Sequence, residues 1–227
     1  MGADAFDPKV VTIGEGPREQ LPAAGVPADF VPFENADRLV EELLTGRIDA
    51  AWNGPVAHVR VRQRTGGRSR SLAMRDCDRD CRTLVLVRRD SGIERTADLE
   101  GHVLAVGPHD SAQTRILPLH FLRQADVDCT RIRLLGCNRS EDDVLGAIRS
   151  GRADAGCVGE REAGTIDAAK VRVLLRTPSF DRCMLDARPS LDEEAVEALT
   201  RALFSMRFES AAHRRILELA GMRAWMP

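Results

Sequence analysis

Short apolar runs alternate with amphipathic stretches along the whole chain, and this alternation constrains the fold more than any other feature. The runs TLVLV (83–87) and VLAV (103–106) have the length and composition of buried strands. The segments 35–46 and 112–123 carry apolar residues at helical spacing. Strands that alternate with helices predict an α/β fold with mainly parallel sheets. The pattern restarts at Val103, which predicts two similar lobes.

The same reasoning predicts elements for the remainder of the chain. We expect further strands at 9–14, 28–33, 47–52, 69–74, 131–135, 153–158 and 171–175. We expect further helices at 56–64, 140–150, 160–169, 192–206 and 210–219, and an irregular segment beginning at Pro178.

Composition excludes several classes of protein. The 227 residues suit one large domain or two lobes of about 110 residues each. The 33 basic and 35 acidic residues give a net charge of −2, and aromatic residues make up 4% of the chain, so we expect no nucleic-acid partner. No apolar run approaches the ~18 residues of a membrane span. The first residues, MGADAFDPKVVTIGEG, show no secretory signal, so a complete chain is expected to be cytoplasmic.

Motifs for common cofactors are absent from the sequence. No GxGxxG follows a strand, and there is no GxxxxGK[ST] sequence, which argues against dinucleotide and P-loop chemistry. No cysteine or histidine spacing suits a zinc centre. We therefore expect neither a cofactor nor a metal.

The stretch VLAVGPHDSAQTRILP (103–118) is the first candidate site. Turn residues at 107–110 end the strand, and Ser111 stands where a helix N-cap belongs. The first N–H groups of a helix lack intrahelical partners and favour an anion, and Ser111, Gln113 and Thr114 add neutral donors. The alternative is an ordinary β–α corner in which Ser111 caps its own helix, and on the local sequence alone we favour that alternative.

Five stretches in order and in register resemble one known family. They are DAAWNGP (49–55), LVLVRRDSGI (84–93) with ADLEG (97–101), GPHDSAQTRILP (107–118), GRADAG (151–156) and Thr177-Pro178. Together they are similar to the phosphate and phosphonate substrate-binding proteins of ABC transporters. The resemblance covers about residues 47–187.

The resemblance implies a type II periplasmic-binding-protein fold, in which two α/β lobes are joined by two hinge strands. Lobe 1 would comprise residues 1–86 and 177–227, and lobe 2 residues 87–176. The two lobes would close on a small anionic or zwitterionic ligand. The resemblance also implies a periplasmic location and an ABC transporter permease as a possible partner.

Several residues depart from the family pattern. Ser111-Ala112-Gln113 stands where the family has Ser-Thr-Ser, Cys81 where it has a tyrosine, and Glu141 where it has a histidine. Gly159, with Glu160 beside it, replaces an aspartate. A carboxylate repels a phosphonate dianion unless it is protonated or paired with a substrate amine. These departures argue against phosphate or a simple phosphonate as the ligand.

Two further pairs are candidates for ligand contact. Trp52 and Asn53 end a predicted strand and offer a ring face and an amide, and the alternative is a half-buried core tryptophan. His109 and Asp110 offer an acid–base pair or an anion donor, and the alternative is a solvated loop histidine.

Four cysteines lie near predicted strand ends or hinges, and the alternative for each is a small buried residue. They are Cys81, Cys137, Cys157 and Cys183. Cys183 follows a proline-containing segment and is the first choice for a functional thiol. We expect all six cysteines to be reduced.

The sequence therefore predicts a solute-binding protein, and the alternative is a cytoplasmic enzyme on the same fold that uses Cys183. The expected ligand-binding residues are Trp52, Asn53, Cys81, His109, Asp110, Ser111, Ala112, Gln113, Thr114, Glu141 and Cys183.

Overall fold

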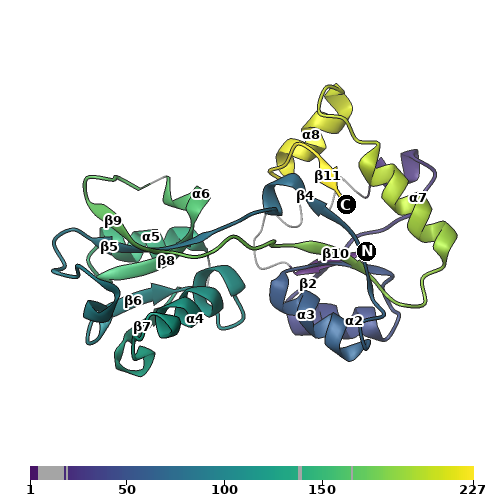
Figure 1. The fold of residues 1–227 in the computed structure, drawn as a ribbon. Helices are drawn as coiled ribbons and strands as arrows, with labels where there is room; N and C mark the ends of the chain where they lie inside the picture. Colours follow the sequence, from purple (N-terminus) through teal and green to yellow (C-terminus); the bar gives the residue numbers. More distant parts are fainter. Residues whose placement is uncertain (5–17, 19, 138–139, 165) are drawn as a thin grey trace. The chain divides into compact units, whose positions relative to one another are not determined.

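The computed structural model describes residues 1–4, 18, 20–137, 140–164 and 166–227 (Figure 1). These residues form two compact units: unit 1 comprises Met1–Arg79 and Asp181–Pro227, and unit 2 comprises Asp80–Phe180. The predicted division after Leu86 falls inside a strand that pairs along its whole length within unit 2. The strand expected at 9–14 lies outside the described residues.

Unit 1 contains a six-stranded sheet with the order β11-β4-β10-β3-β1-β2. Its strands are β1 (Gly2–Asp4), β2 (Val31–Phe33), β3 (Ala50–Asn53), β4 (Arg70–Arg75), β10 (Met184–Ala187) and β11 (Trp225–Met226). β1 runs parallel to β2 and β3, whereas β10 runs antiparallel to both β3 and β4. The short helix η1 (Asp76–Asp78) follows β4.

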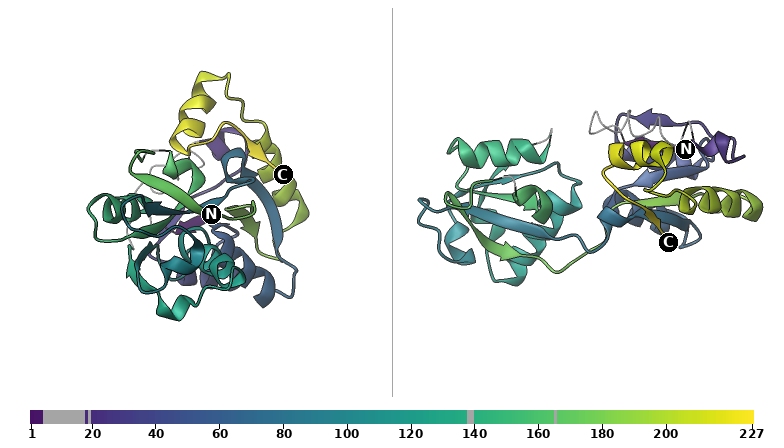
Figure 2. Two further views of the ribbon diagram at one scale, coloured as in Figure 1. Left: turned by 60° about the vertical axis from the view of Figure 1, so that its left-hand side comes forward. Right: turned by 90° about the horizontal axis from the view of Figure 1, so that it is seen from above.

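Helices cover both faces of this sheet (Figure 2). They are α2 (Ala36–Leu44), α3 (Pro55–Arg64), α7 (Glu193–Phe204) and α8 (Ala211–Leu219). Successive residues of a strand point to opposite faces. Ala51 of β3 accordingly packs with α2 and α3, whereas Ala50 and Leu185 pack with α7. Asp186, between Leu185 and Ala187, is therefore on the α3 side.

Unit 2 contains a five-stranded sheet with the order β7-β6-β8-β5-β9. Its strands are β5 (Thr83–Arg88), β6 (Val103–Val106), β7 (Arg133–Gly136), β8 (Ala155–Gly159) and β9 (Val171–Arg176). β6 runs parallel to β7 and β8, and β5 runs antiparallel to β8 and β9.

Two hydrophobic clusters lie on opposite faces of this second sheet. Val85 and Val87 of β5 pack with α4 (Leu117–Gln124), whereas Leu84 and Leu86 pack with α5 (Glu141–Arg149). The remaining helical segments of unit 2 are short. They are η2 (Thr96–Leu99), η3 (Ala112–Ile116), η4 (Cys129–Arg131) and α6 (Glu160–Ala163).

The α/β fold class is confirmed, but the sheets are mixed rather than mainly parallel. The antiparallel strands that sequence patterning missed are β10 and β11, and β10 lies in the segment expected to be irregular. β10 carries a charged residue, Asp186, in a four-residue strand, which hides the apolar pattern. The helix expected at 160–169 ends at Ala163, and residues 166–169 are not helical. No helix in the described ranges combines the length and apolarity needed to cross a membrane.

The close packing of α5 on β8 depends on Gly156. A methyl group built on Gly156 would lie 2.7 Å from Val144 Cγ1 and 2.8 Å from Ile148 Cδ1. We expect Gly156→Ala to lower the free energy of unfolding by about 1–3 kcal/mol, because α5 must move outward. The measurement is urea unfolding followed by circular dichroism.

Gly146 supplies the matched control because it lies within α5, and a Cβ built on it would have no atom within 4 Å apart from the adjacent backbone of its own helix. Gly146→Ala should leave stability unchanged or raise it by up to about 1 kcal/mol, since alanine is the better helix former. Equal stability of native protein and the Gly156→Ala variant would contradict the packing argument.

Candidate functional site

The segment after β6 folds back on the start of its own helix. The N–H of Gly107 donates to the carbonyl of Thr114 at 3.2 Å, and the N–H of Ser111 donates to that of Pro108 at 3.1 Å. Ser111 Oγ accepts from the N–H of Thr114 at 3.2 Å, so the predicted N-cap is confirmed. Ser111 is half-buried, and Thr114 is buried.

The hydroxyl groups of Ser111 and Thr114 share one hydrogen bond of 2.7 Å. Only one of the two O–H groups is consumed in that bond, whichever group donates. The other O–H proton remains available to a bound acceptor. Ser111 is the more exposed of the pair, so its hydroxyl is the natural donor to a solute.

The helix that follows Ser111 begins with a π-turn, η3, before it continues as α4. The N–H of Ile116 donates to the carbonyl of Ser111 at 2.9 Å, five residues earlier. An i→i+5 pattern leaves one more N-terminal amide without an intrahelical acceptor than an α-helix does. This start therefore offers extra donors to an anion, a feature that the sequence did not reveal.

Gln113 is connected to the neighbouring β–α corner through Glu141. Gln113 Nε2 donates to Glu141 Oε1 at 2.8 Å, and the N–H of Gly159 donates to Glu141 Oε2 at 2.6 Å. Gln113 is 7% exposed, and its Oε1 is buried with no hydrogen-bond partner among the described residues. The structure thus brings together Gln113 and Glu141, two of the predicted site residues.

The main chain of Gln113 is hydrogen-bonded as well as its side chain. Thr83 Oγ1 donates to the Gln113 carbonyl at 2.7 Å, and the N–H of Thr83 donates to Thr177 Oγ1 at 3.0 Å. Thr83 and Thr177 are both buried. These threonines anchor the start of η3 to β5, a role that sequence analysis missed although both lie in strand-end positions.

Gly159 is surrounded by polar side chains at close range. A Cβ on Gly159 would lie 2.1 Å from Gln113 Nε2 and 2.2 Å from Glu162 Oε2. A side chain at position 159 would therefore displace the ends of the Gln113 and Glu162 side chains.

Four predicted site residues of unit 2 lie outside this network. His109 is exposed in the turn before Ser111, and Asp110 is half-buried there. Cys81 forms an isolated β-bridge with Phe180, with both N–H···O distances at 2.9 Å. Ala112 opens η3 and contributes backbone alone.

Unit 1 contains a buried polar network around Asp186, which is fully buried. Asn53 Nδ2 donates to Asp186 Oδ2 at 2.9 Å, and Ser71 Oγ donates to Oδ1 at 3.1 Å. His58 Nδ1 lies 2.9 Å from both carboxylate oxygens. The predicted residue Asn53 is itself fully buried, so its amide acts inside unit 1. The sequence feature that could have indicated this network is an acidic residue, Asp186, within the otherwise apolar run MLDA (184–187).

Trp52 is half-buried and contacts two protein groups. Its ring meets Trp225 edge-on, with centroids 6.4 Å apart, and the Arg75 guanidinium lies 4.3 Å from its ring centroid. Arg75 also pairs with Asp78, through contacts of 2.5 and 2.9 Å. This arrangement supports the alternative of a half-buried core tryptophan.

No disulfide joins any of the six cysteines, all of which lie among the described residues. Burial, with a smaller contribution from Asp78, raises the pKa of Cys183 from its ordinary value of 9.0 to about 11. Burial likewise raises the pKa of the Cys157 thiol in the core of unit 2. Because a thiolate is the reactive form, these raised pKa values argue against either residue as a nucleophile at neutral pH.

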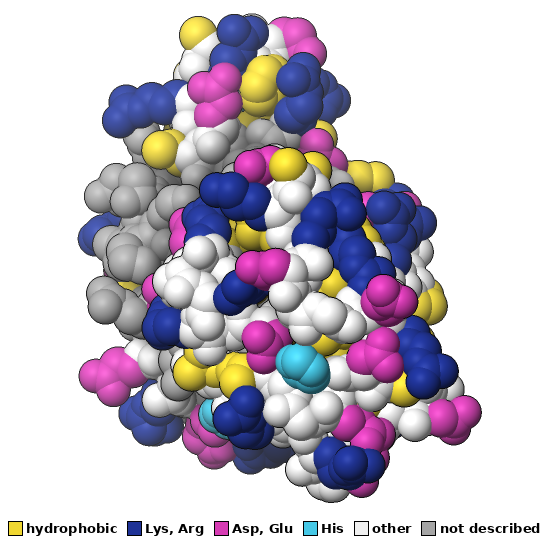
Figure 3. Space-filling view, turned by 90° about the vertical axis from the view of Figure 1, so that its left-hand side faces the viewer, with side chains coloured by type: hydrophobic (Ala, Val, Ile, Leu, Met, Phe, Trp, Pro, Cys, Tyr) yellow, Lys and Arg dark blue, Asp and Glu magenta, His cyan; other side chains and the backbone are white. Residues whose placement is uncertain are grey.

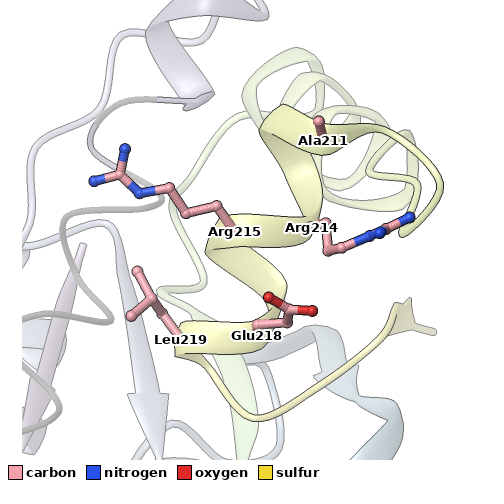
Figure 4. Close-up of a pocket in the computed structure, with 5 residues that line it drawn as sticks. All are labelled: Ala211, Arg214, Arg215, Glu218 and Leu219. Atoms are coloured by element: carbon pink, nitrogen blue, oxygen red, sulfur yellow. The ribbon is translucent and has the colours of Figure 1, made fainter.

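The molecular surface adds little to the candidate site. Figure 3 shows basic and acidic side chains interspersed on the face it presents. Among the described residues, a surface pocket in unit 1 is lined by α8 alone, as Figure 4 shows, with Arg214 and Arg215 adjacent in sequence and Glu218 one turn further along the helix. A depression between side chains of one helix lacks the converging elements of a ligand site.

The family of the chain follows from its similarity to known proteins. A family model described as "ABC transporter, phosphonate, periplasmic substrate-binding protein" matches residues 18–227. The chain belongs to this family. It is accordingly a solute-binding protein of the type associated with ABC transporters, and its two units have the type II periplasmic-binding-protein fold.

Individual similar proteins are distant in sequence and similar in fold. The "Probable ABC transporter phosphite binding protein PhnD1" of Prochlorococcus marinus (strain MIT 9301) is 23% identical over 212 residues, which cover 86% of this chain and 71% of the relative. The structure of PhnD1 with methylphosphonate superposes with a TM-score of 0.80 at 20% identity, covering 99% of this chain and 90% of that one. XAC2383 from Xanthomonas citri, bound to chloride, gives 0.80 at 21% identity, covering 100% and 90%.

The Asp186 network should contribute strongly to the stability of unit 1. Asp186→Ala removes the carboxylate that Asn53, His58 and Ser71 share, so we expect a loss of about 3–5 kcal/mol in the free energy of unfolding. His58→Ala should cost less, about 1–2 kcal/mol, because Asn53 and Ser71 still bind the carboxylate. Urea unfolding measures both.

The control for this prediction is Asp37→Ala, because Asp37 is 78% exposed in its ion pair with Arg60. Its loss should cost less than about 1 kcal/mol. Comparable losses for Asp37→Ala and Asp186→Ala would contradict the assigned importance of the buried carboxylate.

The raised pKa of Cys183 predicts slow alkylation at neutral pH. With a pKa of about 11 instead of 9.0, the thiolate fraction at pH 8 falls about a hundredfold. The rate of iodoacetamide modification should therefore rise about tenfold per pH unit up to about 11. Peptide mapping by mass spectrometry measures it, with a free cysteine peptide as reference. Alkylation at pH 7.5 as fast as that of the peptide would contradict this result.

Proposed function

We propose that this chain delivers a small anionic or zwitterionic solute to an ABC transporter permease in the periplasm, where its family acts. The solute's anionic group is proposed to bind at the start of η3. The observation that carries this proposal is the Ser111–Thr114 hydroxyl pair, which retains one O–H donor beside the amides of the π-turn. Neutral donors of this kind hold oxyanions well at a helix N-terminus.

The surrounding architecture supports a site that is formed before the solute arrives. Thr83 fixes the Gln113 carbonyl, and Ser111 caps the helix, so the donors keep their positions without a ligand. Preformed donors lower the entropic cost of binding. The alternative of a cysteine enzyme lacks comparable support, because the Cys183 pKa is raised rather than lowered.

Ser111→Asp tests the proposed anion site. Aspartate caps a helix as well as serine does, so the melting temperature without solute should change by less than about 3 °C. The added negative charge should abolish anion binding at η3. The measurement is the solute-induced rise in melting temperature, with ethanesulfonate, taurine, ethylphosphonate and 2-aminoethylphosphonate as probes at millimolar concentration.

We expect at least one probe to raise the melting temperature of the native chain and none to raise that of the variant. Ser210→Ala is the control, since Ser210 precedes α8 without a side-chain cap hydrogen bond. The proposal fails if no probe binds the native chain, or if Ser111→Asp binds a probe as tightly as the native chain does.

A further inference from the structure

Two half-buried cysteines of unit 1, Cys77 and Cys183, lie in segments that are hydrogen-bonded to each other. The residue after Cys183 pairs with β4, and the residue before it, Arg182, donates its N–H to the Asp78 carbonyl at 2.8 Å. Cys183 is therefore opposite residues 75–77. Hydrogen-bonded extended segments are about 4.8 Å apart, which is within the ~4.4–6.8 Å that separate the Cα atoms of a disulfide.

The two cysteines also lie on the same face of the unit 1 sheet. Cys77 packs on the buried cluster that α8 forms with the segments beside it. Leu185 packs with α7, and residues two apart in an extended strand point the same way, so Cys183 faces the side of α7 as well. Trp225 packs against both clusters, which makes them neighbours on this one face.

The ionisation of Cys183 indicates that the two thiols are near each other. Burial and then Asp78 raise the pKa of the Cys183 thiol to about 11, and Cys77 adds a smaller rise. The interaction between two charges falls off with distance, so the contribution of Cys77 requires a short separation. Arg182 and Arg75 act on this pKa in the opposite sense, because their positive charges favour the Cys183 thiolate.

We propose that Cys77 and Cys183 form a disulfide when an external disulfide, such as that of glutathione, oxidises them. The Cys77 thiolate attacks the external disulfide, which gives a mixed disulfide and releases one thiol. The Cys183 thiolate then attacks the Cys77 sulfur and releases the second thiol. The two cysteine protons end on the two released thiols, and the external disulfide accepts the two electrons. The family acts in the periplasm, where disulfides form and persist.

Such a bridge joins the two stretches of unit 1 at the point where the chain leaves this unit and returns to it. The first stretch ends at Arg79 and the second begins at Asp181, with the whole of unit 2 between them. A cross-link that closes a long loop removes conformational freedom mainly from the unfolded chain. The oxidised protein is therefore the more stable form, with or without a solute, and this inference does not depend on the proposed function.

Tryptic mapping without reduction tests the pairing on the full chain. The protein is reduced, then incubated with glutathione disulfide at pH 8, and the remaining thiols are blocked before digestion. Trypsin places Cys77 in peptide 76–79 and Cys81 in peptide 80–82, so mass spectrometry distinguishes the two as partners.

The peptide that contains Cys183 is 183–201, because Arg188 precedes a proline and is not cleaved. The expected product is peptide 76–79 joined to peptide 183–201, and dithiothreitol should abolish it. Absence of this product, or peptide 183–201 joined only to peptide 80–82, overturns the inference.

Thermal unfolding gives the second readout. The oxidised native protein should melt about 5–15 °C above the reduced protein, and the difference should vanish in both Cys77→Ala and Cys183→Ala. Cys129→Ala is the matched control, because Cys129 is a half-buried cysteine of unit 2, and this variant should keep the native difference. Equal melting temperatures of oxidised and reduced native protein, or a difference that persists in both of the first two variants, overturns the inference.

Discussion

The hydrogen bond from the Gly159 N–H to Glu141 connects the fold of unit 2 to the chemistry of its candidate site. Glu141 begins α5, and Gly159 ends β8, so the bond forms only where the helix packs tightly on the strand. Gly156 permits that close approach. Glu141 then orients the Gln113 amide. Packing in the core of unit 2 thereby fixes the position of a side chain in η3.

The carboxylates of Asp186 and Glu141 are hydrogen-bonded within their own units. In unit 1, Asp186 lies within the sheet and meets the side chains of Asn53, His58 and Ser71. In unit 2, Glu141 accepts from the Gln113 side chain and from the N–H of Gly159. One amide oxygen beside each carboxylate, Asn53 Oδ1 and Gln113 Oε1, is buried with no partner among the described residues. Each of these two acceptors lowers the stability of its unit unless another group donates to it.

Sequence reasoning predicted the α/β class, the N-cap at Ser111 and the family, because each depends on local patterns or ordered motifs. It missed β10, since a charged residue in a four-residue strand breaks the apolar pattern. It also missed the π-turn, because Ala112–Ile116 has an ordinary helical composition. The roles of Thr83, Thr177 and Glu162 depend on contacts between segments far apart in the chain, which local spacing does not encode.

The β-bridge between Cys81 and Phe180 joins the first and last segments of unit 2. Unit 2 is therefore one uninterrupted stretch of chain whose ends are adjacent, inserted into a unit 1 made of two stretches. Adjacent ends are the arrangement in which domain insertion and circular permutation are tolerated. Recombination can therefore replace unit 2 as one piece, while the Asp186 network of unit 1 stays intact.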